Sequence, residues 1–249
     1  MTHGTFSDKR ICLGLAHYLA KRGATCWLME WRGHGSSPPA VEQFDFETIA
    51  LYDVPAVLHY LQQREKVVSL HAVTHSGGGL ALLMCLLRQP QWQPLFGKLV
   101  LFACQACHAA PSPSRRLLLR SARLLSSCLG RVPGKRLGIG VQDEPFYLMS
   151  QWFDWNLAGR FVGQDGFDYL PALAHLPHPV LAVCADHDPF IAPPAACRRF
   201  FQALSGPQHR YLLAGQGGIA QGYRHGSIML SRRAALEIWP RVANWLDLD

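Results

Sequence analysis

The stretch Val73-Thr74-His75-Ser76-Gly77-Gly78-Gly79 decides how this sequence is expected to fold. An apolar run, Ser69–Thr74, precedes it, and a helical pattern, Gly78–Arg88, follows it. A serine on a sharp turn between a buried strand and a helix exposes its hydroxyl above the sheet, and the next amide can face an anion. We therefore expect a reactive serine at position 76, with His75 beside it. A glycine-rich helix start without catalysis is the alternative.

Short apolar runs alternate with helical patterns along most of the chain, which predicts a mostly parallel sheet with helices on both faces. The other expected strands are Ala24–Trp31, Lys98–Cys104, Pro179–Ala185 and His209–Leu213. The other expected helices are Lys9–Lys21, Phe46–Gln63, Pro194–Leu204 and a terminal one from about Met229 to Leu246. The alternation stops from about His108 to Leu176. We expect residues 1–107 and 177–249 to form the α/β core and residues 108–176 to form a helical cap.

Two further side chains follow Ser76 in an order that suits nucleophilic catalysis. A serine hydroxyl needs a base, and the base needs a carboxylate that fixes its tautomer. His225 precedes the terminal helix, and Asp186 and Asp188 follow an expected strand. We expect Ser76, His225 and Asp188 to form a triad because Pro189 turns the chain outward after Asp188. Asp186 is the alternative acid.

The turn His3-Gly4 completes this set of residues. A His-Gly turn before a helix commonly presents a backbone amide to an oxyanion, together with the amide after the nucleophile. We expect the N–H of Gly77 and that of either Thr5 or Phe6 to form an oxyanion hole.

The composition suits one globular protein. Among the 249 residues, 49% are hydrophobic and only 16% are charged, so the chain can bury a large core. The N-terminus lacks a secretory signal and the eight cysteines lie mostly in apolar runs, so we expect free thiols and a cytoplasmic protein. The spacing Cys104-Gln-Ala-Cys107-His108 matches a haem attachment pattern but ends an apolar strand. We expect packing there and not haem attachment.

The net charge of +7 is concentrated in the expected cap. Between Ala109 and Gln142 there are seven basic residues and no acidic ones: Arg115, Arg116, Arg120, Arg123, Arg131, Lys135 and Arg136. No nucleic-acid-binding module accompanies them, so we expect no nucleic-acid partner.

Within the cap, the helical pattern Ser114–Leu129 separates basic residues from most of its leucines. Such a helix suits transient contact with an anionic lipid surface. The alternative is an ordinary lid helix with its apolar face against the core. Six aromatic residues of the cap could line an acyl pocket or only pack its core: Trp152, Phe153, Trp155, Phe161, Phe167 and Tyr169.

With these residues the chain resembles the α/β-hydrolase superfamily, over essentially its whole length except the cap. Residues Ala50–Tyr60 followed by Val73–Ser76 are similar to the acid-lipase and bacterial lipase-like branch, and Glu30–Ser37 is similar to a structural turn of the family. Thr74 departs from the family pattern, which has glycine there. The resemblance implies a serine hydrolase of small-molecule or lipid carboxylic esters that needs no cofactor. A thioester or amide hydrolase, or a non-catalytic binding protein of this fold, is the alternative.

The N-terminus departs from the family more strongly. In the family a central strand leads into the His-Gly turn, whereas only Met1 and Thr2 precede His3. Unpaired backbone groups inside a sheet cost about 1–3 kcal/mol each. We therefore expect a longer natural N-terminus that supplies the missing strands.

Overall fold

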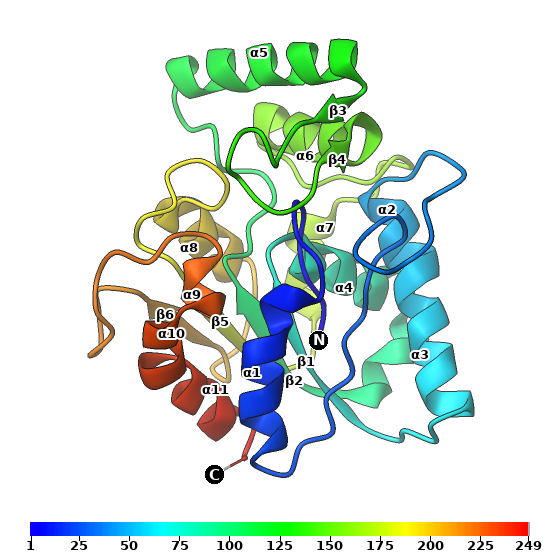
Figure 1. The fold of residues 1–249 in the computed structure, drawn as a ribbon, viewed down its shortest axis with the longest axis vertical. Helices are drawn as coiled ribbons and strands as arrows, with labels where there is room; N and C mark the ends of the chain where they lie inside the picture. Colours follow the sequence, from blue (N-terminus) through cyan, green and yellow to red (C-terminus); the bar gives the residue numbers. More distant parts are fainter. Residues whose placement is uncertain (249) are drawn as a thin grey trace.

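The central sheet is parallel, as predicted. The computed structural model describes residues 1–248, and its main sheet has the order β1-β2-β5-β6 (Figure 1). The strands are β1 (Leu70–His75), β2 (Phe96–Phe102), β5 (Val180–Cys184) and β6 (Arg210–Leu213). In register, Thr74 lies beside Leu101, Leu101 beside Ala182, and Ala182 beside Tyr211. The carboxyl ends of the strands therefore meet at one edge of the sheet.

Thr2 extends this sheet beyond β1. It forms parallel bridges to both Met29 and Thr74, and its N–H donates to the carbonyl of Val73 at 3.1 Å. The expected strand Ala24–Trp31 is wrong apart from the bridge at Met29. A strand needs a partner along its length, and the bridge that this segment forms within residues 1–248 is to Thr2.

Helices cover both faces of the sheet because its strand residues are apolar on both sides. Val73, Val100 and Val183 pack with α1 (Arg10–Ala20) and the C-terminal helices. The alternate residues, including Leu99 and Leu101, pack in a second cluster on the other side of the sheet. The remaining helices on that second side are α2 (Phe46–Thr48), α3 (Val54–Gln63), α4 (Gly77–Arg88) and η2 (Pro90–Leu95), while α8 (Pro194–Gln202) contributes to both clusters.

Two expected helices are interrupted. The helix expected over Phe46–Gln63 contains a π-helical turn, η1 (Ile49–Asp53), between α2 and α3. The terminal helix is three short helices: α9 (Ser227–Leu230), α10 (Arg232–Glu237) and α11 (Trp239–Trp245). Ser231 is extended, and its hydroxyl accepts the Ala234 N–H at 3.0 Å, so it starts a new helix. Pro240 then occupies the first turn of α11, where a missing N–H costs nothing.

Residues 108–176 begin over one end of the sheet (Figure 1) and end in the core, where Tyr169 and Leu173 are buried. They contain α5 (Pro113–Leu129), β3 (Arg131–Val132), β4 (Glu144–Pro145), α6 (Phe146–Ala158), α7 (Tyr169–Ala172) and η3 (Leu173–His175). Figure 1 shows α5 at the extreme end of the molecule, above α6. No helix in residues 1–248 combines the length and apolar character needed to cross a bilayer.

Helix α5 leaves most of its leucines exposed. Its packed stripe consists of Leu119, Ala122 and Ser126, and Ser126 is its one fully buried residue. Leu117 and Leu124 are 65% and 66% exposed. Leu118, Leu119, Leu125 and Leu129 line a large pocket, so a lid helix with part of its apolar face turned inward stays a prediction.

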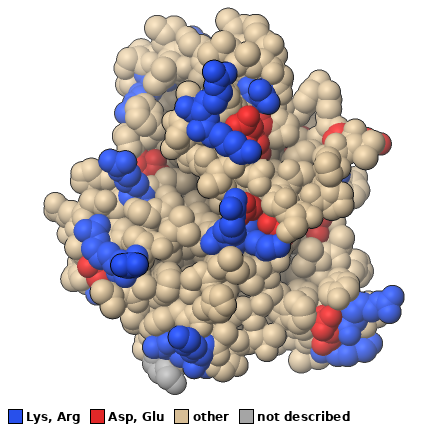
Figure 2. All heavy atoms as spheres, viewed as in Figure 1, with Lys and Arg blue, Asp and Glu red and all other residues tan. Residues whose placement is uncertain are grey.

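Several basic residues of the insert have acidic partners outside the basic stretch. Arg123 binds Asp154 at 2.8 Å, and Arg131 lies 3.6 Å from Asp143. On the face in Figure 2, Lys and Arg form separate groups, several of them beside acidic side chains. The basic residues do not form one continuous stripe on that face.

Candidate active site

Ser76 sits on a strained turn between β1 and α4. Its backbone has φ 52° and ψ −121°, and its N–H donates to the carbonyl of Phe102 at 2.7 Å. A residue other than glycine in such a conformation costs about 1–3 kcal/mol and persists only where its surroundings enforce it. The turn places Ser76 at the wall of a large pocket.

Glycines allow neighbouring backbones to press against this turn. A Cβ built on Gly4 would lie 2.7 Å from the Cβ of Ser76, and one on Gly78 would lie 2.3 Å from the carbonyl of His3. Any larger residue at either position would separate the His-Gly turn from the serine. Thr74 is accommodated although the family pattern has glycine there, because its hydroxyl donates to the Val100 carbonyl at 3.1 Å.

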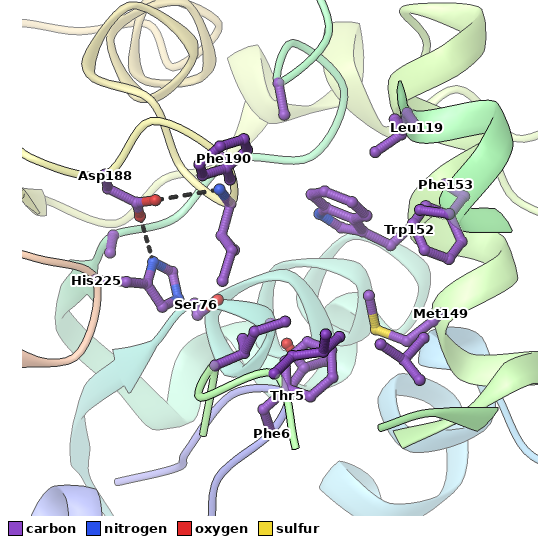
Figure 3. A pocket seen from close by; sticks show the side chains of 18 of the residues that line it. Thr5, Phe6, Ser76, Leu119, Met149, Trp152, Phe153, Asp188, Phe190 and His225 are labelled. Carbon is purple, nitrogen blue, oxygen red and sulfur yellow. Dashed lines mark hydrogen bonds and ion pairs between the residues drawn. The ribbon is translucent and has the colours of Figure 1, made fainter. Parts of the chain in front are cut away.

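His225 and Asp188 form a hydrogen-bonded pair beside Ser76 (Figure 3). The Nδ1 atom of His225 lies 2.5 Å from Oδ2 of Asp188, whose side chain is 4% exposed. The carboxylate also accepts the N–H groups of Ile191 and Ala192, each at 3.1 Å. Burial works to raise the pKa of Asp188, but the hydrogen bond and charge of His225 outweigh it and lower the pKa. Asp188 is therefore held as a carboxylate.

Asp186 occupies a different position. Its carboxylate accepts the N–H groups of Gly222 and Tyr223, each at 2.8 Å, and it lies 2.9 Å from Nδ1 of His187. Burial acts to raise its pKa, and these hydrogen bonds lower it overall. Asp186 thus ties down the loop before His225, whereas Asp188 contacts His225 directly.

Two buried histidines support the site without charge. His75 is buried; its Nε2–H donates to the carbonyl of His225 at 3.0 Å, and burial lowers its pKa to about 3. His3 donates from Nδ1 to the carbonyl of Gly4 at 2.8 Å and accepts the N–H of Trp31 at 3.2 Å. Burial lowers the pKa of His3 to about 4. Both rings are therefore neutral supports for the backbone around the site.

The three amides expected to face an oxyanion are not equivalent. Within residues 1–248, neither Thr5 N–H nor Gly77 N–H has a hydrogen-bond acceptor. Phe6 N–H donates to the carboxylate of Glu144. Of the two amides that the sequence left open, Thr5 is free and Phe6 is engaged. Glu144 was not predicted, because nothing in the pattern of the cap sequence marks it.

The pocket beside Ser76 has a volume of about 850 Å³ and a mainly apolar wall. Its wall includes Leu119, Met149, Trp152, Phe153 and Phe190 (Figure 3). Of the other aromatic residues predicted to line it, Trp155, Phe161 and Tyr169 are buried in the core, and Phe167 packs against it. Within residues 1–248, no group of three or more His, Cys, Asp or Glu side chains is placed to hold a metal ion.

Comparisons with known proteins agree with this fold. The family model described as "Alpha/beta hydrolase family" matches residues 1–237. A search of curated proteins finds no match. Among solved structures, a monoacylglycerol lipase of Paleococcus ferrophilus is similar, with 17% identity, 100% of this chain and 93% of that chain covered, and a TM-score of 0.69. A thermophilic esterase of Thermogutta terrifontis has 15% identity, coverage of 99% and 88%, and a TM-score of 0.63. A bromoperoxidase of Bacillus anthracis has 16% identity, coverage of 99% and 90%, and a TM-score of 0.69.

Proposed function

Because this chain belongs to the alpha/beta hydrolase family, we propose that it is a serine hydrolase that cleaves carboxylic esters through an acyl-enzyme on Ser76. The observation that carries the proposal is the 2.5 Å contact between His225 and Asp188, beside a serine held on a strained turn. A buried carboxylate that binds an imidazole at an apolar pocket is typical of a catalytic site, because it stabilises the imidazolium that forms when the imidazole takes up a proton.

The geometry suits the following sequence of steps. Asp188 accepts the Nδ1–H of His225, which leaves Nε2 unprotonated to take the proton of the Ser76 hydroxyl. The serine oxygen attacks the ester carbonyl, and the free N–H groups of Thr5 and Gly77 stabilise the resulting oxyanion. His225 then gives its proton to the departing alcohol. Water, activated by the same imidazole, releases the acid and restores Ser76.

The pocket favours an ester with an apolar acyl group. Its volume of about 850 Å³ lies within the usual range of small-molecule sites, and its wall is mainly aliphatic and aromatic. The similar protein from Paleococcus ferrophilus is named a monoacylglycerol lipase, so monoacylglycerols of graded chain length are the first substrates to test. Thioesters and amides of the same acyl groups are the alternative substrates.

Contact with an anionic lipid surface through α5 is part of this proposal. Leu117 and Leu124 are exposed within the stretch Ala109–Gln142, which contains seven basic residues and no acidic ones. Exposed leucines can enter the headgroup region while arginines bind lipid phosphates. The contact would bring the pocket, which α5 partly lines, close to lipid esters.

Covalent labelling tests the proposal directly. A fluorophosphonate probe should label the wild-type protein, and Ser76→Ala should abolish both labelling and turnover of p-nitrophenyl butyrate with an unchanged circular dichroism spectrum. Wild-type turnover in Ser76→Ala would refute the mechanism. A folded wild-type protein that is neither labelled nor active would indicate a binding protein instead.

A further inference from the structure

We propose that Glu144, a residue of the insert, is a positioning residue for the oxyanion hole, and that His34 is its paired partner. The inference rests on the proposed function, because it assigns a role within the same site. Glu144 is 0% exposed and lies at the start of β4, far in sequence from the N-terminal turn that it contacts.

The carboxylate of Glu144 binds two groups from different parts of the core. It accepts the backbone N–H of Phe6, and it lies 3.0 and 3.1 Å from Nε2 of His34. A buried carboxylate is costly unless its oxygens are paired. The insert therefore reaches into the core at this point through one fully paired acidic side chain.

Other atoms of the insert hold Phe6 from its opposite end. The carbonyl of Phe6 accepts the N–H groups of Val141 at 2.8 Å and Gln142 at 3.2 Å. A Cβ built on Gly140 would lie 2.1 Å from that carbonyl oxygen, so the loop needs glycine there. Phe6 itself has φ 59°, a left-handed conformation that a bulky residue adopts only when its surroundings enforce it.

This arrangement controls the amide of Thr5. The Thr5 carbonyl and the Phe6 N–H share one planar peptide unit, so anchoring the Phe6 N–H fixes the orientation of that plane. Fixing the plane limits the rotation of Thr5 and thus the direction of its own N–H. Thr5 lines the pocket beside Ser76 (Figure 3), and its N–H, unlike that of Phe6, has no acceptor within residues 1–248.

His34 is the partner that makes the anchor sensitive to pH. Its Nδ1 faces the carbonyl of Arg32 at 2.9 Å and its Nε2 faces Glu144. Both partners are acceptors, so both ring nitrogens carry a proton and the ring is an imidazolium. Burial works to lower the pKa of His34, but the hydrogen bond and charge of Glu144 outweigh it and raise the pKa.

The other titratable groups near His34 are His3, whose ring centroid lies 5.2 Å away, and Glu30. His3 is neutral because its pKa is lowered to about 4. The ion pair with Glu144 is thus complete below the unfolded His pKa of about 6.5 and is lost as the pH rises through the raised pKa.

Three variants test the proposal, with p-nitrophenyl butyrate as the substrate and an alkyl trifluoromethyl ketone as a probe of the oxyanion hole. Glu144→Ala should lower kcat and weaken the ketone about 10- to 100-fold, with KM changed less than about 3-fold, since losing one donor costs about 10²–10³. Asp143→Asn is the matched control, because Asp143 binds Lys135 N–H and Arg131 within the insert. It should keep wild-type values.

Glu144→Gln tests the positioning role through the dependence of kcat on pH. A purely structural role of Glu144 predicts no change in this dependence. Its amide can still accept the Phe6 N–H and can donate to a neutral His34, so kcat at pH 7 should stay within about 5-fold of wild type. The wild type should lose kcat as the pH rises through the raised pKa of His34, and Glu144→Gln should not lose it there.

The outcomes separate this inference from the proposed function. Wild-type kcat and ketone affinity in Glu144→Ala, or identical alkaline profiles for Glu144→Gln and wild type, would overturn the role of Glu144 while leaving Ser76 catalysis intact. If Glu144→Ala does not fold, the pH profile of Glu144→Gln still decides. Turnover that survives Ser76→Ala would overturn both.

Discussion

Replacing Asp188 by asparagine removes one charge and one acceptor from the centre of the site. The carboxylate now accepts three N–H groups: those of His225, Ile191 and Ala192. An asparagine has one acceptor oxygen in place of two. If its oxygen faces His225 and Ala192, its NH₂ group must face the Ile191 N–H. If it is flipped, the NH₂ group faces His225 and favours the wrong tautomer.

Both orientations cost stability, and both cost rate. One buried donor is left without an acceptor, which costs about 1–3 kcal/mol and lowers Tm by roughly 2–10 °C for a chain of this size. The loss of the anion and of the correct tautomer lowers kcat by about 10⁴, equivalent to about 5.5 kcal/mol of transition-state stabilisation. In free energy, the loss of transition-state stabilisation should therefore exceed the loss of folding stability.

Asp186→Asn is the matched control for this variant. It removes the same charge two residues earlier, from a side chain that binds the loop at Gly222 and Tyr223. We expect kcat within about 10-fold of wild type in p-nitrophenyl butyrate hydrolysis, and a comparable loss in Tm. A fall of 10³ or more in Asp186→Asn, with Asp188→Asn near wild type, would refute the assignment of the acid.

Three further variants probe other contacts. Gly4→Ala should lower kcat at least about 10-fold, because its Cβ would lie 2.7 Å from that of Ser76; a wild-type rate would show that the turn is free to move. Glu47→Gln should cost about 1–3 kcal/mol in urea unfolding, because its buried carboxylate accepts the Tyr169 hydroxyl at 2.9 Å among other donors; an unchanged midpoint would contradict this. The double variant of Leu117 and Leu124 to serine should slow hydrolysis of esters in anionic vesicles several-fold and spare soluble esters; equal rates on vesicles would exclude lipid contact through α5.

The sequence predicts the core of the fold and the placement of the site residues because both depend on local patterns. Buried parallel strands are continuous apolar runs, and the residues after them must meet at one edge of the sheet. That is why Ser76, Asp188 and His225 could be expected at one pocket. The family and the parallel sheet are confirmed, whereas the catalytic roles of these residues stay predictions.

The features that the sequence does not predict depend on contacts between distant segments. Ala24–Trp31 has the composition of a strand, but strand pairing also requires a neighbour, and Thr2 bridges it at Met29. The leucines of α5 form a stripe that predicts burial, yet most of them are exposed, and among them only Leu119 packs against the core. Glu144 is an acidic residue at the start of the short strand β4, and its burial follows only from how the loop before it closes over Phe6.

The buried histidines around the site make the stability of the fold depend on pH in two opposite ways. His3 and His75 are buried and neutral, with pKa values lowered to about 4 and about 3. Each is protonated more readily in the unfolded chain, so each contributes stability above about pH 6.5 that is lost as the pH falls toward its folded pKa. His34 is buried and charged, so its contribution is lost as the pH rises instead. Stability should therefore pass through a maximum, and replacing Glu144 by glutamine should remove only the alkaline decline.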